Sequence, residues 1–327
     1  MPKISLDDIE STTSTALMRH GASDDIAAQV AHAVRTSESR GNKICGLYYV
    51  ESYCRQLESG RVDGTALPTV DQPRPGVVRV DGKFGFAQSA FRAGFDAATD
   101  AAKTNGICGY SIEHTHTCTS LGYFTEQLAR AGYLALGATN ATPRVAPPGG
   151  RNRLLGTNPI ALSVPDGDGG VAFGFDFSTS AVALGTITMA AAAGEPIPLG
   201  WAIDADGEPT TDPNAALEGS LVSVGGYKGF GLGLLVELLA AGLTGGNRSV
   251  EVPPLKAPEG PSHNLGQFYI VIDPAAYEAD AFYSLIESLG EDIANDPGTR
   301  LPGSTPPDPT EVEVDEATWR LITSLAE

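Results

Sequence analysis

Three side chains that can move protons or bind metals alternate along one short segment. His114, His116 and Cys118 occupy every second position within residues 110–118, and on a regular strand all three would point to one face. A histidine titrates near neutral pH, so His116 and His114 are candidate proton donors or acceptors. A polar strand edge beside a pocket is the plainer interpretation.

Zinc binding is the other chemistry that this pattern allows. Histidine and cysteine are good zinc ligands, and three of them with one water would form a catalytic site. Three ligands on one strand rarely converge on one tetrahedral ion, so we expect no metal site.

Cys45 is a further reactive candidate. As a thiolate beside His114 or His116 it would be a nucleophile, although a buried, inert thiol is the commoner role of a cysteine. The four cysteines of the chain show no C-x-x-C spacing, which is typical of reduced thiols in the cytoplasm.

A long irregular stretch separates two segments that resemble strands. Residues 138–159, ATNATPRVAPPGGRNRLLGTNP, hold four prolines, three glycines and three arginines. A loop of this length is uncommon in a compact domain unless it is functional, and its glycines allow a ligand to approach the backbone closely. From composition alone, a binding loop and an ordinary surface excursion fit this stretch equally well.

This loop is one of several blocks that resemble the malate/L-lactate dehydrogenase family of the second, non-Rossmann type. Residues 176–180 (DFSTS) resemble the D-M-A-T-S segment of that family, and residues 197–217, 225–245 and 264–274 are similar to further blocks in the same order. The resemblance implies an α/β, non-Rossmann fold with a helical N-terminal lobe, an NAD or NADP cofactor and a homodimer. A G-x-G-x-x-G fingerprint is absent, since residues 229–233 (GFGLG) have a different spacing.

The resemblance also implies where the cofactor lies. In the family it contacts the proline- and glycine-rich loop, the D-M-A-T-S segment and a G-G-x-K-G turn. A lysine can supply a point charge to a phosphate, and hydroxyl and N–H groups at helix starts can hold a pyrophosphate. The matching positions of this chain are Ala141, Thr142, Asp176, Phe177, Ser178 and Lys228.

At the catalytic positions the chain departs from the family. The helical lobe of the family ends in G-x-x-S-H-G-x-x-R, in which the arginine pairs with the substrate carboxylate. Residues 41–49 of this chain read GNKICGLYY, so Ile44, Cys45 and Tyr49 take the places of the serine, histidine and arginine. A phenol cannot replace the planar fork that matches a carboxylate.

The proton donor of the family is displaced as well. Its strand ends in N-S-x-H-F-G-x-x-G-Y, and alignment on Gly122 and Tyr123 puts Thr117 at the histidine position and His116 one place earlier. A one-residue shift would bring His116 to the site. We expect malate, lactate and sulfolactate to be poor substrates, unless a nearby cation restores the lost charge. The candidate cations are Lys43, Arg144 and Arg151.

Three functions fit these residues. The first is an NAD(P)-dependent oxidoreductase for an atypical 2-keto, 2-hydroxy or imino acid, with Tyr48 or Tyr49 shaping its pocket. The second keeps the fold but performs lyase, dehydratase or hydrolytic chemistry through Cys45 and His114 or His116. The third is a non-catalytic relic that binds a nucleotide. We favour the first.

The elements that position these residues follow from apolar periodicity and from stop signals. We expect helices over residues 5–21, 23–38, 47–57, 86–105, 121–131, 178–193, 280–291 and 315–325. We expect strands over residues 77–80, 110–118, 132–137, 160–164, 171–177 and 264–274, and irregular connections over residues 257–264 and 296–309. The chain then divides into a helical lobe of residues 1–72, joined by C-terminal helices of residues 275–327, and an α/β core of residues 73–274 for nucleotide binding and dimerisation.

The charge balance limits the partners. The chain has 21 Lys and Arg against 40 Asp and Glu, a net charge of −19, so its surface should repel nucleic acid and anionic lipid. The start has no long apolar run. The longest apolar stretch, residues 230–243, is too short to span a bilayer and carries Glu237. We expect a cytoplasmic protein that binds a small molecule, with neither nucleic acid nor a membrane as partner.

Overall fold

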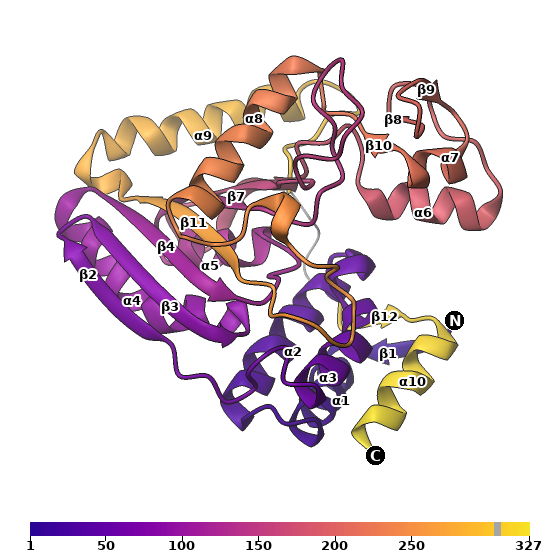
Figure 1. The fold of residues 1–327 in the computed structure, drawn as a ribbon. Coiled ribbons are helices and arrows are strands. Elements are labelled where there is room, and N and C mark those ends of the chain that lie inside the picture. The colour runs from indigo at the N-terminus through magenta and orange to yellow at the C-terminus, as the bar shows by residue number, and fades with distance from the viewer. Residues whose placement is uncertain (304–308) are drawn as a thin grey trace.

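A seven-stranded mixed sheet forms the centre of the molecule (Figure 1). This computed structural model describes residues 1–303 and 309–327. In spatial order the strands are β2 (Thr69–Arg74), β3 (Val77–Gly85), β4 (Ile107–Thr115), β11 (Leu265–Ile272), β5 (Leu134–Thr139), β6 (Ile160–Pro165) and β7 (Val171–Phe177). β3 and β4 run parallel, and the other neighbouring pairs run antiparallel. A Rossmann sheet is built from parallel strands, so the expected non-Rossmann α/β fold is confirmed.

Two helices pack on this sheet and complete its core. They are α4 (Ala87–Asn105) and α5 (Gly122–Arg130). Phe91 of α4 and Phe124 of α5 meet edge to face, with ring centroids 5.0 Å apart, and both contact the ring of Tyr269 on β11. Aromatic rings bury large apolar areas, so this cluster joins the helices to the middle of the sheet.

The first helices form a separate lobe, as expected. Ser5 and Ser23 cap them, since each side chain accepts a hydrogen bond from the backbone three residues on, at Asp8 and Ile26. Their apolar faces pack around one buried cluster. These helices are α1 (Leu6–Arg19), α2 (Asp24–Ser39) and α3 (Val50–Glu58).

The C-terminal segment completes this lobe (Figure 1). β12 (Glu311–Glu313) pairs antiparallel with β1 (Lys3–Ser5), and α10 (Glu316–Ala326) packs on α1. α9 (Ala279–Ala294), which we expected beside the lobe, lies at the opposite end of the molecule (Figure 1). The domain division stays a prediction.

A group of short elements forms a third unit, here called the small lobe (residues 184–221). Its buried cluster includes Ile187, Ile197 and Leu221, and the long loop joins it through Val145 and Leu155. Its elements are α6 (Leu184–Ala193), β8 (Ala202–Ile203), β9 (Pro209–Thr210), α7 (Pro213–Glu218) and β10 (Ser220–Leu221). The helix expected from residue 178 therefore begins six residues later, at Leu184.

The remaining helical segment lies beside the end of the long loop, where the side chain of Asn158 donates a hydrogen bond to the carbonyl of Gly233. α8 (Tyr227–Glu237) continues directly into a π-helical turn (Leu238–Gly242). Short 3-10 turns lie at Lys43–Cys45, Leu47–Tyr49, Ser249–Glu251 and Pro274–Ala276. Over residues 1–303 and 309–327, no helix has the length and apolar character needed to cross a membrane.

The strand expected over residues 110–118 ends early. β4 stops at Thr115, the backbone of His114 has a φ of +53°, and the pairing with β11 shifts register between Leu265 and Gln267. The alternation that would place His114 and His116 on one face is therefore broken. Part of the irregular connection expected over residues 296–309 falls on residues 304–308, which lie outside the described residues.

The contact between α10 and the helical lobe can be tested by a large-to-small substitution. Ile322 is 1% exposed and belongs to the buried cluster of the lobe, whereas its neighbour Leu321 is 38% exposed. We expect Ile322→Ala to lower the free energy of unfolding by about 2–4 kcal/mol, because it leaves a cavity. Leu321→Ala should lower it by less than about 1 kcal/mol. Urea denaturation followed by circular dichroism measures both values, and equal losses would show that α10 does not anchor through Ile322.

Candidate active site

One large cavity, of about 1060 Å³, lies where the helical lobe, the long loop, the end of β7 and the small lobe meet. We call it the main cavity. Its volume is at the upper end of the range for small-molecule sites. Residues from distant parts of the chain line it, among them Cys45, Tyr48, Tyr49, Ala141, Thr142, Arg144, Asp176, Phe177, Ser178, Lys256 and Asp315.

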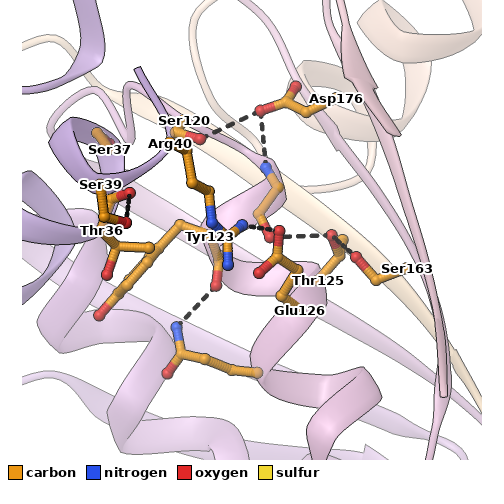
Figure 2. A network of polar contacts seen from close by, with 12 residues as sticks. Thr36, Ser37, Ser39, Arg40, Ser120, Tyr123, Thr125, Glu126, Ser163 and Asp176 are labelled. Carbon is orange, nitrogen blue, oxygen red and sulfur yellow. Dashed lines mark hydrogen bonds and ion pairs between the residues drawn. The ribbon is translucent and has the colours of Figure 1, made fainter. Parts of the chain in front are cut away.

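An ion pair and a buried carboxylate hold the helical-lobe wall of the main cavity. Arg40, which follows α2, pairs with Glu126 of α5 and so ties the lobe to the core (Figure 2). Glu38 accepts a hydrogen bond of 2.8 Å from the backbone N–H of Leu47. These contacts fix both ends of the turn that carries Cys45.

Cys45 lies in the wall of the main cavity, but its thiol is not activated. Desolvation raises the pKa of Cys45 to about 12, and the nearby charge of Asp176 contributes in the same direction. Because the thiolate is the nucleophilic form of cysteine, Cys45 stays protonated near neutral pH. The hydrolytic function that would need this thiolate has no support from the geometry.

Tyr49 occupies the position of the lost arginine as a neutral phenol. Its ring stacks on Tyr53 at 5.7 Å between centroids, and burial raises the pKa of its hydroxyl to about 12. A neutral hydroxyl can donate one hydrogen bond, but it supplies no positive charge to a substrate carboxylate.

Asp176 brings a carboxyl group to the main cavity at the end of β7. The backbone N–H of Gly122 donates to its Oδ2 at 2.8 Å, and the Ser120 hydroxyl donates to the same oxygen at 3.3 Å (Figure 2). Desolvation by the surrounding protein raises the pKa of Asp176, and these two hydrogen bonds offset part of the shift. The carboxyl group therefore holds a proton more readily than a surface aspartate does.

His116 does not line the main cavity. It is 2% exposed, and its Nε2 lies 2.6 Å from Oε1 of Gln56. The amide nitrogen of Gln56 donates to the carbonyls of Leu255 and Ala257, at 2.8 and 2.7 Å, so its oxygen faces the histidine. The hydrogen on Nε2 is thus committed to Gln56.

A second histidine, His263, stacks on His116 with ring centroids 4.1 Å apart. Its Nδ1 accepts a hydrogen bond of 3.3 Å from the backbone N–H of Thr117, which is the position aligned with the proton donor of the family. Burial is the main cause that lowers the pKa of both histidines, to about 3 for His263. The pair is neutral, buried and structural in its contacts.

His114 belongs neither to the lining of the main cavity nor to the stacked pair of His116 and His263. Its Nδ1 is 3.0 Å from Oδ1 of Asp81 on β3, outside the main cavity. The structure therefore does not bring His114, His116 and Cys45 together. Within the described ranges, no group of three or more His, Cys, Asp and Glu residues has a geometry that would hold a metal ion.

The residues expected to contact the cofactor divide into two sets. Ala141, Thr142, Asp176, Phe177 and Ser178 all line the main cavity. Lys228, in the first turn of α8, is exposed and lies outside the lining.

Arg144 adds a cation to the loop side of the main cavity. It is half-buried and lies two residues after Thr142, and its Nε–H is buried with no hydrogen-bond partner among the described residues. A guanidinium with an unpaired donor matches a phosphate, so the donor set of the cavity fits a nicotinamide dinucleotide.

Sequence reasoning missed two contributors to the cavity. Lys256 lies in the wall beside Tyr48 and Tyr49, and Gln56 fixes the segment that carries it. Neither residue belongs to a recognisable motif. Of the three cations considered from the sequence, Lys43 and Arg144 line the main cavity and Arg151 does not.

Comparison with known proteins defines the class. The family model of malate/L-lactate dehydrogenase matches residues 4–310, so the chain belongs to that family, and the resemblance seen in the sequence is confirmed. Among its relatives is the delta(1)-pyrroline-2-carboxylate/delta(1)-piperideine-2-carboxylate reductase of Pseudomonas putida. It is 38% identical over 302 residues, which cover 92% of this chain and 88% of the relative.

Two further matches extend over almost the whole chain. The (2R)-3-sulfolactate dehydrogenase (NADP(+)) of Chromohalobacter salexigens is 38% identical over 301 residues, covering 92% of this chain and 90% of the relative. The crystal structure of delta1-piperideine-2-carboxylate reductase from Pseudomonas syringae superposes with a TM-score of 0.90 at 34% identity, covering 99% and 100% of the two chains. The protein is an enzyme, an oxidoreductase that uses NAD or NADP.

The burial of His116 and His263 leads to a prediction about how the unfolding free energy changes at acid pH. An unfolded histidine binds a proton below pH 6.5 or so, but folded His263 stays neutral until pH falls to about 3. Its contribution to stability is therefore complete above about pH 6.5 and is lost as the pH falls towards 3.

His263→Gln keeps an acceptor for the Thr117 N–H but cannot be protonated. Between pH 7.5 and pH 5, the wild-type chain should lose about 2 kcal/mol more unfolding free energy than this variant. Urea titrations at the two pH values measure the difference, and parallel losses would show that His263 does not carry the acid sensitivity.

Proposed function

We propose that this chain is an NAD(P)H-dependent reductase of small cyclic imino acids, of the class of pyrroline-2-carboxylate and piperideine-2-carboxylate. One observation carries the proposal: among the described residues that line the main cavity there is no histidine. A keto acid needs a proton on its oxygen as the hydride arrives, and histidine suits that task at neutral pH. A protonated imine brings its own proton.

The reaction then balances without a proton donor in the hydride step. The reduced cofactor supplies a hydride when bound. The hydride adds to the carbon of the C=N–H⁺ group, the π electron pair moves to nitrogen, and the nitrogen keeps its proton as a secondary amine. The product takes up a further proton from water.

Asp176 is the carboxyl group proposed to serve the iminium ion. Three carboxylic residues line the main cavity in the described part of the chain: Glu38, Asp176 and Asp315. Glu38 accepts from the backbone of Leu47, and Asp315 caps α10 by accepting from Thr318. Asp176 also accepts hydrogen bonds, from Gly122 and Ser120, but it alone adjoins Phe177 and Ser178, where the cofactor is proposed to lie. It is therefore the carboxyl group proposed to hold the substrate proton or to stabilise the positive nitrogen.

The other expected site residues take secondary roles in this proposal. Cys45 and Tyr49 shape the wall of the main cavity as neutral groups. His116 and Thr117 lie outside the lining, where His116 contacts Gln56 and Thr117 donates to His263. His114 also lies outside the lining, beside Asp81.

The cofactor is proposed to lie against the long loop and the end of β7. Ala141 and Thr142 contribute from the loop, and Phe177 and Ser178 from the strand end, where the Phe177 ring stacks on Phe175 at 4.6 Å. Arg144 is the phosphate partner inside the cavity. Lys228 remains a proposed second partner, reached by a part of the cofactor that extends beyond the cavity.

Steady-state assays test the substrate class, with NADH and NADPH for the imines and pyruvate and with NAD⁺ and NADP⁺ for malate, lactate and sulfolactate. We expect kcat/KM for pyrroline-2-carboxylate or piperideine-2-carboxylate to exceed that for pyruvate, malate, lactate or sulfolactate by at least about a hundredfold, the usual contribution of a positioned acid or base. A keto or hydroxy acid turned over as well as the imines would reject the proposal. So would the absence of imine turnover with both cofactors.

A homodimer is proposed from the apolar surface of α8 and of the π-helical turn that follows it. Leu235 and Leu238 are exposed on successive turns, Leu238 by 66%, and Leu243 continues the patch. Exposed patches of this kind mark interaction sites, and a second copy of the chain is the partner that the family resemblance implies.

Sedimentation equilibrium tests the dimer. We expect a mass of about twice 33.9 kDa for the wild-type chain. Leu238→Lys should yield monomers with an unchanged circular dichroism spectrum, because a buried unpaired charge disfavours the interface. Leu285→Lys on α9, at a position also exposed, is the matched control and should stay dimeric. A monomeric wild-type chain would exclude the interface.

The cytoplasm is proposed as the location. All four cysteines are free, and three of them are buried: Cys54, Cys108 and Cys118. Free thiols of this kind are typical of a reducing compartment. A small molecule is the expected partner, with no nucleic acid or membrane, since the chain carries a net charge of −19.

A further inference from the structure

We infer that Lys256 is the cation that receives the carboxylate of the substrate, in place of the arginine that Tyr49 replaces. The inference rests on the proposed function, in which the substrate is a small cyclic acid. It assigns a specificity-determining role to a residue outside every motif of the sequence.

The position of Lys256 is the first observation. Its Nζ lies 3.5 Å from the centroid of the Tyr48 ring and 5.7 Å from that of Tyr49, and it donates a hydrogen bond of 3.3 Å to the carbonyl oxygen of Tyr48. Lys256 therefore places a positive charge within about 6 Å of Tyr49, the residue aligned with the arginine of the family.

The second observation is that the ammonium group of Lys256 has no carboxylate partner among the described residues and has N–H donors left for a ligand. Over residues 1–303 and 309–327, no carboxylate lies within ion-pair distance of Lys256. An ammonium group has three N–H donors, and one of them is engaged by Tyr48. The others face a ligand or water, in a chain whose net charge is −19.

The third observation is that hydrogen bonds from Gln56 and Arg61 fix the backbone on both sides of Lys256. Gln56 donates to the carbonyls of Leu255 and Ala257, at 2.8 and 2.7 Å. Arg61 donates to the carbonyl of Pro254 at 3.0 Å and also to that of Ala257. The residues on both sides of Lys256 are therefore fixed to the end of α3, and its side chain starts from a rigid position.

The other cations of the main cavity serve other groups. Lys43 donates to the carbonyl oxygen of Glu313, as Lys256 does to that of Tyr48, but its charge also acts on the carboxyl group of Glu38, whose pKa it lowers. Arg144 belongs to the loop that the cofactor is proposed to contact, where a guanidinium suits a phosphate. Lys256, whose Nζ lies against the rings of Tyr48 and Tyr49 in the cavity wall, is the cation placed for the substrate.

A matched pair of planar ring probes tests the charge recognition without turnover. Pyrrole-2-carboxylate and pyrrole-2-carboxamide have the same shape and differ in charge. We titrate each into the full chain saturated with NADP⁺ and follow binding by calorimetry. Lys256→Met keeps the aliphatic stem and removes the charge, so it should weaken carboxylate binding about ten- to hundredfold, the effect of one charged hydrogen bond. Carboxamide binding should change less than about threefold.

Two further variants separate the roles of the cations. Lys256→Arg should restore carboxylate binding to within about fivefold of the wild type, since it restores the charge. Arg144→Met should weaken NADPH binding, measured by fluorescence titration, and leave the preference for carboxylate over carboxamide intact. Lys256→Met should leave NADPH binding unchanged.

Three results would overturn the inference. They are equal losses for carboxylate and carboxamide in Lys256→Met, a loss of NADPH binding in that variant, and no carboxylate binding by the wild-type chain. A wild-type chain that binds the carboxylate through Lys256 but reduces no imine would instead reject the proposed function and leave the role of Lys256 standing.

Discussion

A buried polar contact between Arg61, Gln56 and the segment of residues 254–261 holds the active-site region together. Arg61 is 2% exposed and donates to three backbone carbonyls, at Pro254, Ala257 and Pro261. Each hydrogen bond from a charged donor is worth about 1.5–3 kcal/mol, and an unpaired buried carbonyl is costly. The segment that closes the main cavity, drawn in orange beside α3 in Figure 1, therefore stays in place only while these donors satisfy it.

The same contact holds His116 as a neutral side chain outside the lining of the main cavity. The oxygen of Gln56 accepts from Nε2 of His116, and the Arg61 charge helps to keep the stacked pair of His116 and His263 neutral. A histidine useful in catalysis must change charge near neutral pH, whereas a buried support must not. The contacts of His116 are those of a buried support, which agrees with the proposed substrate, an imine that arrives already protonated.

The sequence predicted the parts of the fold and site that depend on local signals. Ser5 and Ser23 marked two helix starts, β7 was predicted to the residue, and the family blocks gave the loop and the strand end that line the main cavity. The place of His116 was not predictable, because the positive φ of His114 disturbs the strand and β4 ends at Thr115, one residue before His116. The role of Gln56 was beyond reach for another reason: its partner carbonyls lie about two hundred residues away in the chain.

The pairing of β1 with β12 has a consequence for how the protein is made. Residues 3–5 can form their two-stranded sheet only after residues 311–313 have been synthesised. The wall of the main cavity also includes Asp315 and Thr318 from this late part of the chain. Contacts so distant in sequence form late in folding. During translation, the helical lobe must therefore stay open, with part of its apolar surface exposed, until residues 311–326 have left the ribosome. The main cavity, whose lining includes Asp315 and Thr318, is likewise complete only after this last segment has docked.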